Sequence, residues 1–286
     1  MVLYNPKSRH KVRVVDVTYR RDADGSWPAR VYLPEGQGPF PALLDVHGGA
    51  WTRGGCTDNE LIDRALSASG MVVVAMECRK SPKYPYPSQP MDVNYATRWA
   101  KAHAGDFNAV ADCIGGLGAS SGGHSLLLSA MRPDDPRYGA LDLPDAKGVD
   151  ARLSYLMAAW PVIDPYARYF FAKENHNSFL VEATDAYFLS RDNMKEGNPL
   201  LALERGEALD LPPALIIQGT DDANVPLASL DRLAAAYRAA GGTMDIEWFP
   251  DMPHGFALKA GPETDKALEM MKAFVGRRLS GYKSGS

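Results

Sequence analysis

Gly118-Ala119-Ser120-Ser121-Gly122 stands near the middle of the 286-residue chain, and the rest of the sequence is best interpreted outward from it. An apolar run over 113–117 precedes these residues, and a helix-like run over 124–131 follows them. They match G-x-S-x-G, a pattern found where a strand turns sharply into a helix and exposes a serine hydroxyl. The pattern also arises by chance in a chain with 26 glycines, so the residues around it must show whether it marks a catalytic serine.

A second glycine-rich stretch, His47-Gly48-Gly49-Ala50-Trp51, follows the apolar run 41–46 upstream. A loop of this type after a strand can supply backbone N–H groups to an oxyanion hole. We expect Gly49 and Ala50 to donate, together with the N–H of Ser121, the residue after the serine. The alternative is an ordinary glycine turn at the end of a strand.

Two more strands near the C-terminus are each followed by a polar loop. Residues 213–219 lead to Asp221 and Asp222, and residues 246–249 lead to His254. A serine hydroxyl is a weak nucleophile and needs a base to take its proton. A histidine oriented by a carboxylate is such a base, so Ser120, Asp222 and His254 are the candidate catalytic residues. Taken alone, His254 could also be an ordinary surface histidine.

These pieces carry a family resemblance. HGGAW (47–51), GASSGGHS (118–125), QGTDDANVP (218–226) and PHGF (253–256) resemble serine esterases of the α/β-hydrolase superfamily, in its hormone-sensitive-lipase-like and feruloyl/acetyl-esterase-like groups. The order Ser, Asp, His along the chain is the α/β-hydrolase order. In that family the acid falls three residues after the strand-end glycine and precedes Val-Pro, which implies Asp222 rather than Asp221. Ala50 departs from the family's usual third glycine, which implies a tighter oxyanion pocket.

The arrangement of apolar segments predicts the fold class. An opening antiparallel hairpin or meander over 12–33 is followed by alternating strands and helices, and the later strands are continuous apolar runs. Such runs are typical of parallel strands that are covered on both faces. We therefore expect an α/β protein with a doubly wound, mostly parallel sheet, and the resemblance implies an α/β-hydrolase fold in a single domain over 1–286.

Residues 161–205 interrupt the alternation of strands and helices and fit the family pattern poorly. They lie where members of the family place a cap insertion. The segment is rich in aromatic residues. Some of these rings are expected to line the substrate pocket, although they could equally pack on each other and on the core. The candidate substrate-binding residues are Trp51, Tyr166, Tyr169, Phe170, Tyr187 and Phe188.

Composition excludes several classes of function. Hydrophobic residues make up 45% of the chain and charged residues 23%, and the formal net charge is −4, which favours neither nucleic acid nor an anionic membrane as a partner. The first thirteen residues lack the apolar core of a secretory signal, and no run approaches the length of a membrane span. The three cysteines have neither disulfide-framework nor metal-site spacing. We expect a cytoplasmic protein that uses no metal and no cofactor.

The most specific expectation is hydrolysis of a small carboxylic ester through an acyl-enzyme on Ser120. An amidase of the arylformamidase or exopeptidase type would use the same three residues and stays open as an alternative. A non-enzymatic binding protein with this fold is a third, although such proteins often lose one of the three residues. Esterases of this group often form a homodimer through the last strand and helix. Met270, Met271 and Phe274 would fit such an interface or the core.

Overall fold

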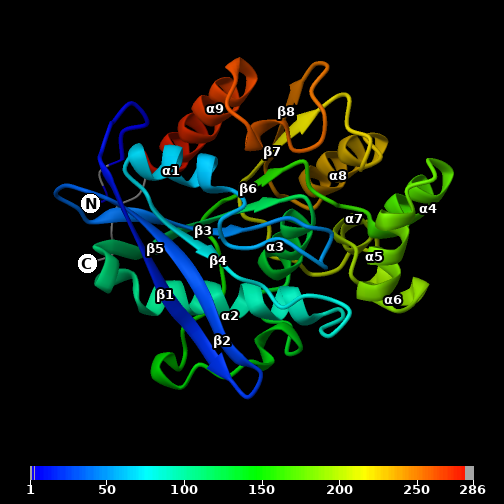
Figure 1. Cartoon of the computed structure of the whole chain (residues 1–286), viewed down its shortest axis with the longest axis horizontal. Helices are drawn as coiled ribbons and strands as arrows, with labels where there is room; N and C mark the ends of the chain where they lie inside the picture. Colours follow the sequence, from blue (N-terminus) through cyan, green and yellow to red (C-terminus); the bar gives the residue numbers. More distant parts are fainter. Residues whose placement is uncertain (1, 3, 281–286) are drawn as a thin grey trace.

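One sheet of eight strands runs through the protein (Figure 1). The structure is a computed structural model that describes residue 2 and residues 4–280, so the six C-terminal residues of the expected domain lie outside it. The strands lie in the order β1-β2-β4-β3-β5-β6-β7-β8. Their bounds are β1 Val12–Asp22, β2 Gly25–Pro34, β3 Phe40–Val46, β4 Val72–Met76, β5 Ala109–Ala119, β6 Leu156–Ala159, β7 Ala214–Gly219 and β8 Met244–Phe249.

The sheet is antiparallel at its N-terminal edge and parallel elsewhere. β1 and β2 form a hairpin that pairs Val12 with Pro34, and β2 also runs antiparallel to β4. The pairs from β4 through β3, β5, β6 and β7 to β8 are all parallel. The predicted opening hairpin and the mostly parallel sheet are therefore confirmed.

Helices cover both faces of the sheet. Side chains of alternate strand residues form two apolar clusters, because successive residues of a strand point to opposite faces. Leu43 packs in the cluster that contains α1 and α9, whereas Leu44 packs in the cluster that contains α2, α3 and α8. The bounds are α1 Glu60–Ala68, α2 Ser88–Ala102, α3 Ser121–Met131, α8 Ala228–Ala239 and α9 Pro262–Leu279, with short 3-10 turns at Ala104–Phe107, Tyr138–Ala140, Pro144–Ala146 and Phe256–Leu258.

Residues 161–205, which we call the cap segment, leave the sheet after β6 and return to it at β7. They form α4 Pro165–Glu174, α5 Ser178–Phe188, α6 Arg191–Glu196 and α7 Pro199–Glu204, and α4 to α6 lie together at one side of the molecule (Figure 1). Each of these helices begins after a side chain that accepts a hydrogen bond from the first turn, which is the favoured N-cap arrangement. The four caps are Asp164, Asn177, Ser190 and Asn198.

Two further features concern the predictions made from composition. None of the helices in the described ranges combines the length and the apolar character that crossing a bilayer requires. Cys56, Cys78 and Cys113 form no disulfide with one another.

Candidate active site

Four loops that carry candidate residues meet at one edge of the sheet. The Gly-rich stretch 47–51 follows β3, Ser120 follows β5, Asp222 lies three residues beyond β7, and His254 lies five beyond β8. β3, β5, β7 and β8 belong to the parallel part of the sheet, so their carboxyl ends share one edge. Ligands of open parallel sheets bind at this edge.

Ser120 sits in a strained turn between β5 and α3. Its φ of 52° and ψ of −117° lie outside the regions that most residues occupy. The turn is tight because Gly122 lies against the end of β3: a Cβ there would lie 2.2 Å from the carbonyl oxygen of Val46. A Cβ at Gly118 would lie 2.8 Å from the carbonyl oxygen of Gly122. Both glycines of the motif are thus required by close backbone approach.

The structure brings the three candidate catalytic residues into one chain of hydrogen bonds. His254 Nε2 lies 2.9 Å from Ser120 Oγ, and His254 Nδ1 lies 2.8 Å from Asp222 Oδ2. Asp221 is exposed, and its side chain makes no hydrogen bond or ion pair with any described residue. With this geometry the imidazole can take a proton from the serine while the carboxylate fixes its orientation.

The environment of Asp222 keeps its carboxyl group charged. Burial opposes ionisation, but hydrogen bonds and the charge of His254, together with Gln218 Nε2 and the N–H of Asn224, outweigh it and lower the pKa of Asp222. Sequence reasoning missed Gln218. The position of Gln218 next to Gly219, at the end of the strand that leads to Asp222, was the signal that could have identified it.

The stretch 47–51 presents unbonded backbone donors. Gly49, Ala50 and Trp51 all have positive φ, at 117°, 52° and 62°, and Trp51 N–H donates to Ser121 Oγ. The N–H groups of Gly49, Ala50 and Ser121 donate to no acceptor in residues 2 and 4–280. Donors left free beside a nucleophile can stabilise a developing oxyanion, so their assignment to an oxyanion hole stays a prediction that this geometry supports.

A cavity of about 360 Å³ opens beside Ser120 and His254. Gly48, Gly49 and Ala50 form one wall. Apolar side chains form others, namely Trp160 at the end of β6, Phe179 and Leu180 from α5, and Leu258 after His254. Small ligands bind in such partly apolar hollows with a few convergent polar groups.

The expected aromatic pocket differs from this cavity. Trp51, Tyr166, Tyr169, Phe170, Tyr187 and Phe188 are all absent from its walls. Trp51 is fully buried and stacks on Tyr187 with ring centres 5.1 Å apart, and Phe188 packs edge-on against it. These three rings pack against one another between the cap segment and the loop after β3. Tyr166, Tyr169 and Phe170 pack against one another on α4 instead.

His124, one helical turn beyond Ser120, joins the cap segment to the stretch 47–51. Trp51 Nε1 donates to its Nδ1 at 3.2 Å, and its Nε2 lies 2.7 Å from the carbonyl oxygen of Gly197. Burial lowers the pKa of His124 to about 4, so the ring is neutral at neutral pH. One nitrogen accepts and the other donates, as only the neutral ring can do.

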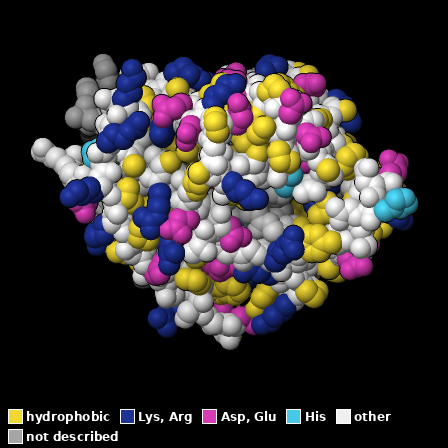
Figure 2. All heavy atoms as spheres, turned by 45° about the horizontal axis from the view of Figure 1, so that its top comes forward, with side chains coloured by type: hydrophobic (Ala, Val, Ile, Leu, Met, Phe, Trp, Pro, Cys, Tyr) yellow, Lys and Arg dark blue, Asp and Glu magenta, His cyan; other side chains and the backbone are white. Residues whose placement is uncertain are grey.

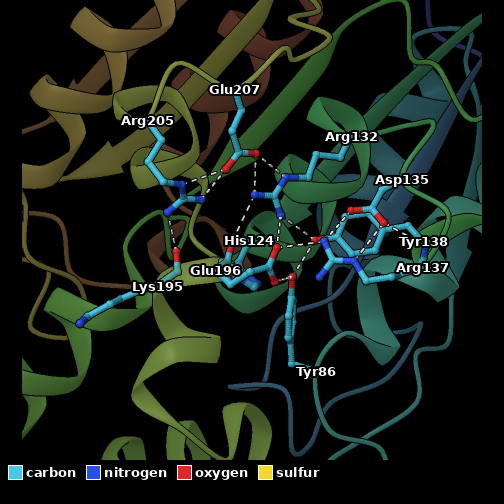
Figure 3. Close-up of polar contacts among 11 residues, drawn as sticks. Tyr86, His124, Arg132, Asp135, Arg137, Tyr138, Lys195, Glu196, Arg205 and Glu207 are labelled. Carbon is cyan, nitrogen blue, oxygen red and sulfur yellow. Dashed lines mark hydrogen bonds and ion pairs between the residues drawn. The ribbon is translucent and has the colours of Figure 1, made fainter.

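A polar network anchors the other end of α3 to the cap segment (Figure 3). Arg132 donates to Glu196 and Glu207, and Tyr86 donates to Glu196 while it shares a hydrogen bond with Tyr138. An open hollow of about 860 Å³ beside this network contains neither Ser120 nor His254. The charged side chains at this hollow largely form ion pairs with one another.

Within residues 2 and 4–280, no group of three or more His, Cys, Asp or Glu side chains is arranged to hold a metal ion.

The fold, together with the strained turn at Ser120, defines an α/β-hydrolase. Comparison with known proteins identifies the family within this superfamily. Residues 29–237 match the family described as BD-FAE, and residues 205–275 match the dienelactone hydrolase family. The chain therefore belongs to the BD-FAE family.

Its relatives include several esterases. It is 26% identical over 246 residues to esterase LipC of Mycobacterium tuberculosis, which covers 84% of this chain. It is 30% identical over 251 residues to an arylesterase of Saccharolobus solfataricus, covering 87% of this chain and 78% of that protein. A solved thermophilic carboxylesterase from a metagenomic library is similar in fold, with a TM-score of 0.77 at 24% identity over 95% of this chain and 91% of that one.

The mycobacterial relatives are longer than the region they share with this chain. The chain spans 59% of the length of LipC and 66% of the length of LipN, the latter a carboxylic ester hydrolase of the same organism. A part of each of these relatives therefore lies outside the matched region.

Proposed function

We propose that the protein is a serine carboxylesterase. The observation that carries the proposal is the continuous hydrogen-bonded chain from Ser120 Oγ through His254 to Asp222, at the mouth of a cavity. Family membership supports it, as do relatives named as esterases. Those names favour an ester over the amide of the amidase alternative.

The first half of the reaction acylates the serine. Ser120 Oγ attacks the ester carbonyl while its proton passes to His254 Nε2, and Asp222 stabilises the imidazolium. The N–H groups of Gly49, Ala50 and Ser121 stabilise the negative charge on the former carbonyl oxygen. When the tetrahedral species collapses, its bond to the alkoxy oxygen breaks, and His254 protonates the departing alcohol.

The second half releases the acid. Water enters, gives a proton to His254 Nε2 and attacks the acyl carbon. The bond to Ser120 Oγ then breaks, the serine recovers its proton, and a carboxylic acid leaves. These residues carry every proton transfer of the cycle.

Turnover of 4-nitrophenyl acetate, compared with that of 4-nitroacetanilide, tests the proposal. We expect hydrolysis of the ester, with activity lost when a fluorophosphonate probe modifies Ser120, as identified by peptide mass spectrometry. Faster cleavage of the anilide would favour the amidase. Absence of both turnover and labelling would favour a binding protein.

A cytoplasmic location and a homodimer are also proposals. The dimer is supported by β8, which lies at the edge of the sheet with Ile246 and Trp248 only partly buried. Met271 and Phe274 are fully buried within the chain and so belong to its core. Light scattering on a size-exclusion column tests the dimer, and cell fractionation tests the location.

A further inference from the structure

Positive charge is concentrated around the cavity that holds Ser120. Three cationic side chains border it, those of Arg53, Arg168 and Lys259, and Asp58 is the only carboxylate among the described residues of its walls. The chain as a whole carries a formal net charge of −4, so the positive charge around the cavity is opposite in sign to the net charge of the molecule. Figure 2 shows a hollow in one face of the molecule, with both basic and acidic side chains at its border.

Arg168 is the buried member of this set. Its side chain is 2% exposed, Nε donates to the carbonyl oxygen of Asn224, and Nη1 donates to Thr184 Oγ1. Nη2 donates to no described residue, and no carboxylate of the described chain lies within ion-pair distance. Burial lowers the pKa of Arg168 to about 10, so the group remains charged at neutral pH.

Asp222 lies near enough to stabilise this charge but does not pair with it. Both carboxylate oxygens of Asp222 already accept hydrogen bonds, Oδ2 from His254 and Gln218, and Oδ1 from the N–H groups of Asn224 and Val225. The guanidinium also lies 5.3 Å from the centre of the Trp51 ring, but it forms no ion pair within the described residues. A buried cation without an ion-pair partner is costly, and the cost falls when an anion binds beside it. Arg168 therefore retains capacity for an anionic ligand in the wall of the cavity.

Arg53 and Lys259 are the exposed members, and they come from two different loops. Arg53 lies just after the stretch 47–51, and Lys259 follows the 3-10 turn after His254. Neither forms an ion pair with a described residue, and the Arg53 guanidinium lies 4.1 Å from the centre of the Phe179 ring. Unpaired charges of one sign at the mouth of a cleft attract a ligand of the opposite sign.

We propose that the substrate is an ester that bears a carboxylate, joined to the reacting group through a short apolar or aromatic body. Arg168 binds the carboxylate, Arg53 and Lys259 draw it into the cavity, and Trp160, Phe179 and Leu258 contact the apolar body. This inference rests on the proposed esterase function and makes Arg168 a specificity-determining residue. Because guanidinium–carboxylate hydrogen bonds are charge-assisted, their gain should exceed that of a neutral pair.

Two matched substrate series test the proposal, one for each side of the ester bond. The first compares 4-acetoxybenzoate, 4-acetoxybenzamide and (4-acetoxyphenyl)trimethylammonium, with each kcat/KM divided by the rate of hydroxide hydrolysis. The second compares the 4-nitrophenyl monoester of adipic acid with 4-nitrophenyl pentanoate. We expect the carboxylate to be preferred by about tenfold or more in at least one series. Added salt should weaken the preference, and the trimethylammonium ester should be the poorest substrate.

Variants show whether the cations cause the preference. Arg53→Gln with Lys259→Gln should lower the ratio of carboxylate to neutral kcat/KM by about threefold or more, since both side chains are exposed and their loss removes two charges. Arg168→Met should lower the ratio further, and Arg168→Lys should retain part of it. A merely structural role of Arg168 would lower both rates together. Lys11→Gln, an exposed lysine outside the cavity, is the charge-matched control.

The possible results separate the inference from the function. Equal normalised rates for the carboxylate and neutral esters, or a preference that the cavity variants leave unchanged, would overturn the inference while the esterase function stands. Absence of turnover of every ester together with absence of labelling at Ser120 would overturn both.

Discussion

Arg132 Nη1 lies 2.9 Å from Glu196 Oε1, and this contact ties the end of α3 to the end of α6. α3 begins at Ser121, directly after the candidate nucleophile. The cap segment is therefore attached to the serine-bearing helix at both ends of that helix, through Arg132 at one end and through His124 at the other.

Glu196→Gln should loosen this attachment. The substitution removes the charge that accepts from Arg132, Arg137 and Tyr86, and hydrogen bonds to charged groups contribute about 1.5–3 kcal/mol. We expect faster amide exchange in α6 with little change in the central strands, measured by hydrogen exchange with mass spectrometry. Glu174→Gln is the control, because Glu174 is an exposed residue of α4 that forms no ion pair with any residue that the structure describes. Unchanged exchange in α6 would show that the network adds no stability there.

Ser120→Ala should reduce kcat by about 10³-fold or more, in line with removal of a catalytic nucleophile. The hydroxyl adds little packing, so the melting temperature should stay near that of the wild type. Steady-state kinetics with 4-nitrophenyl acetate and thermal unfolding provide the two measurements, and exposed Ser26→Ala is the control. Activity within tenfold of the wild type would exclude Ser120 as the nucleophile.

Asp222→Asn and Asp221→Asn form a matched pair. The amide introduced by Asp222→Asn would stabilise the wrong tautomer of His254, a change that costs about 10⁴-fold in kcat in serine proteases. Asp221 is exposed and does not contact the imidazole, so its variant should stay within a few fold of the wild type. Steady-state kinetics on 4-nitrophenyl acetate compares the two variants. If the Asp221 variant were the inactive one, the assignment of the acid would have to be reversed.

Asp63→Asn should stabilise the protein at alkaline pH. Burial, followed by the negative charges of Asp45 and Glu60, raises the pKa of Asp63, and neither of its oxygens has a hydrogen-bond partner among the described residues. A carboxyl group whose pKa is higher in the folded state favours folding at low pH. That contribution is lost as the pH rises above the ordinary range for aspartate, about 3.9.

We therefore expect the free energy of unfolding to fall less steeply between pH 5 and pH 8 in Asp63→Asn than in the wild type. At pH 8 the variant should be more stable by about 1–3 kcal/mol. Urea unfolding at both pH values measures this, with exposed Asp112→Asn as the control. A variant that is less stable than the wild type at pH 8 would contradict the charge argument.

Short acyl chains should be preferred. The cavity of about 360 Å³ is bordered by Trp160, Phe179 and Leu180, which leave little room beyond a small acyl group and its alcohol. In a series of 4-nitrophenyl esters we expect kcat/KM to be highest at about C2 to C4 and to fall at least tenfold by about C8, because such pockets discriminate by about 1–3 kcal/mol per methylene. A maximum at C10 or longer would indicate an extended groove instead.

The sequence predicted those parts of the structure that depend on local signals. The helix-like run over 124–131 lies within α3, and the apolar run over 246–249 lies within β8. The strand that ends at Gly219 and the strand that ends at Phe249 each lead into a polar loop, and these loops carry Asp222 and His254, which the structure brings to Ser120. Each of these features depends on a few neighbouring residues and on the shared edge of parallel strands.

The walls of the cavity could not be predicted in the same way. An aromatic residue in a poorly patterned segment can face the ligand or its own neighbours, and composition does not distinguish the two. Trp51 turns inward to stack on Tyr187, 136 positions later by their numbering, because the backbone is left-handed from Gly49 to Trp51. Arg168 was missed for the same reason: its significance comes from Asn224 and Thr184, which lie far from it in sequence.

The position of the cap segment between β6 and β7 has a consequence for how this protein can diverge. Ser120, Asp222 and His254 all lie outside residues 161–205, whereas Arg168, Phe179 and Leu180 lie inside. Descendants can therefore lengthen, shorten or exchange this one insertion and accept different compounds while they inherit the same chemical machinery intact.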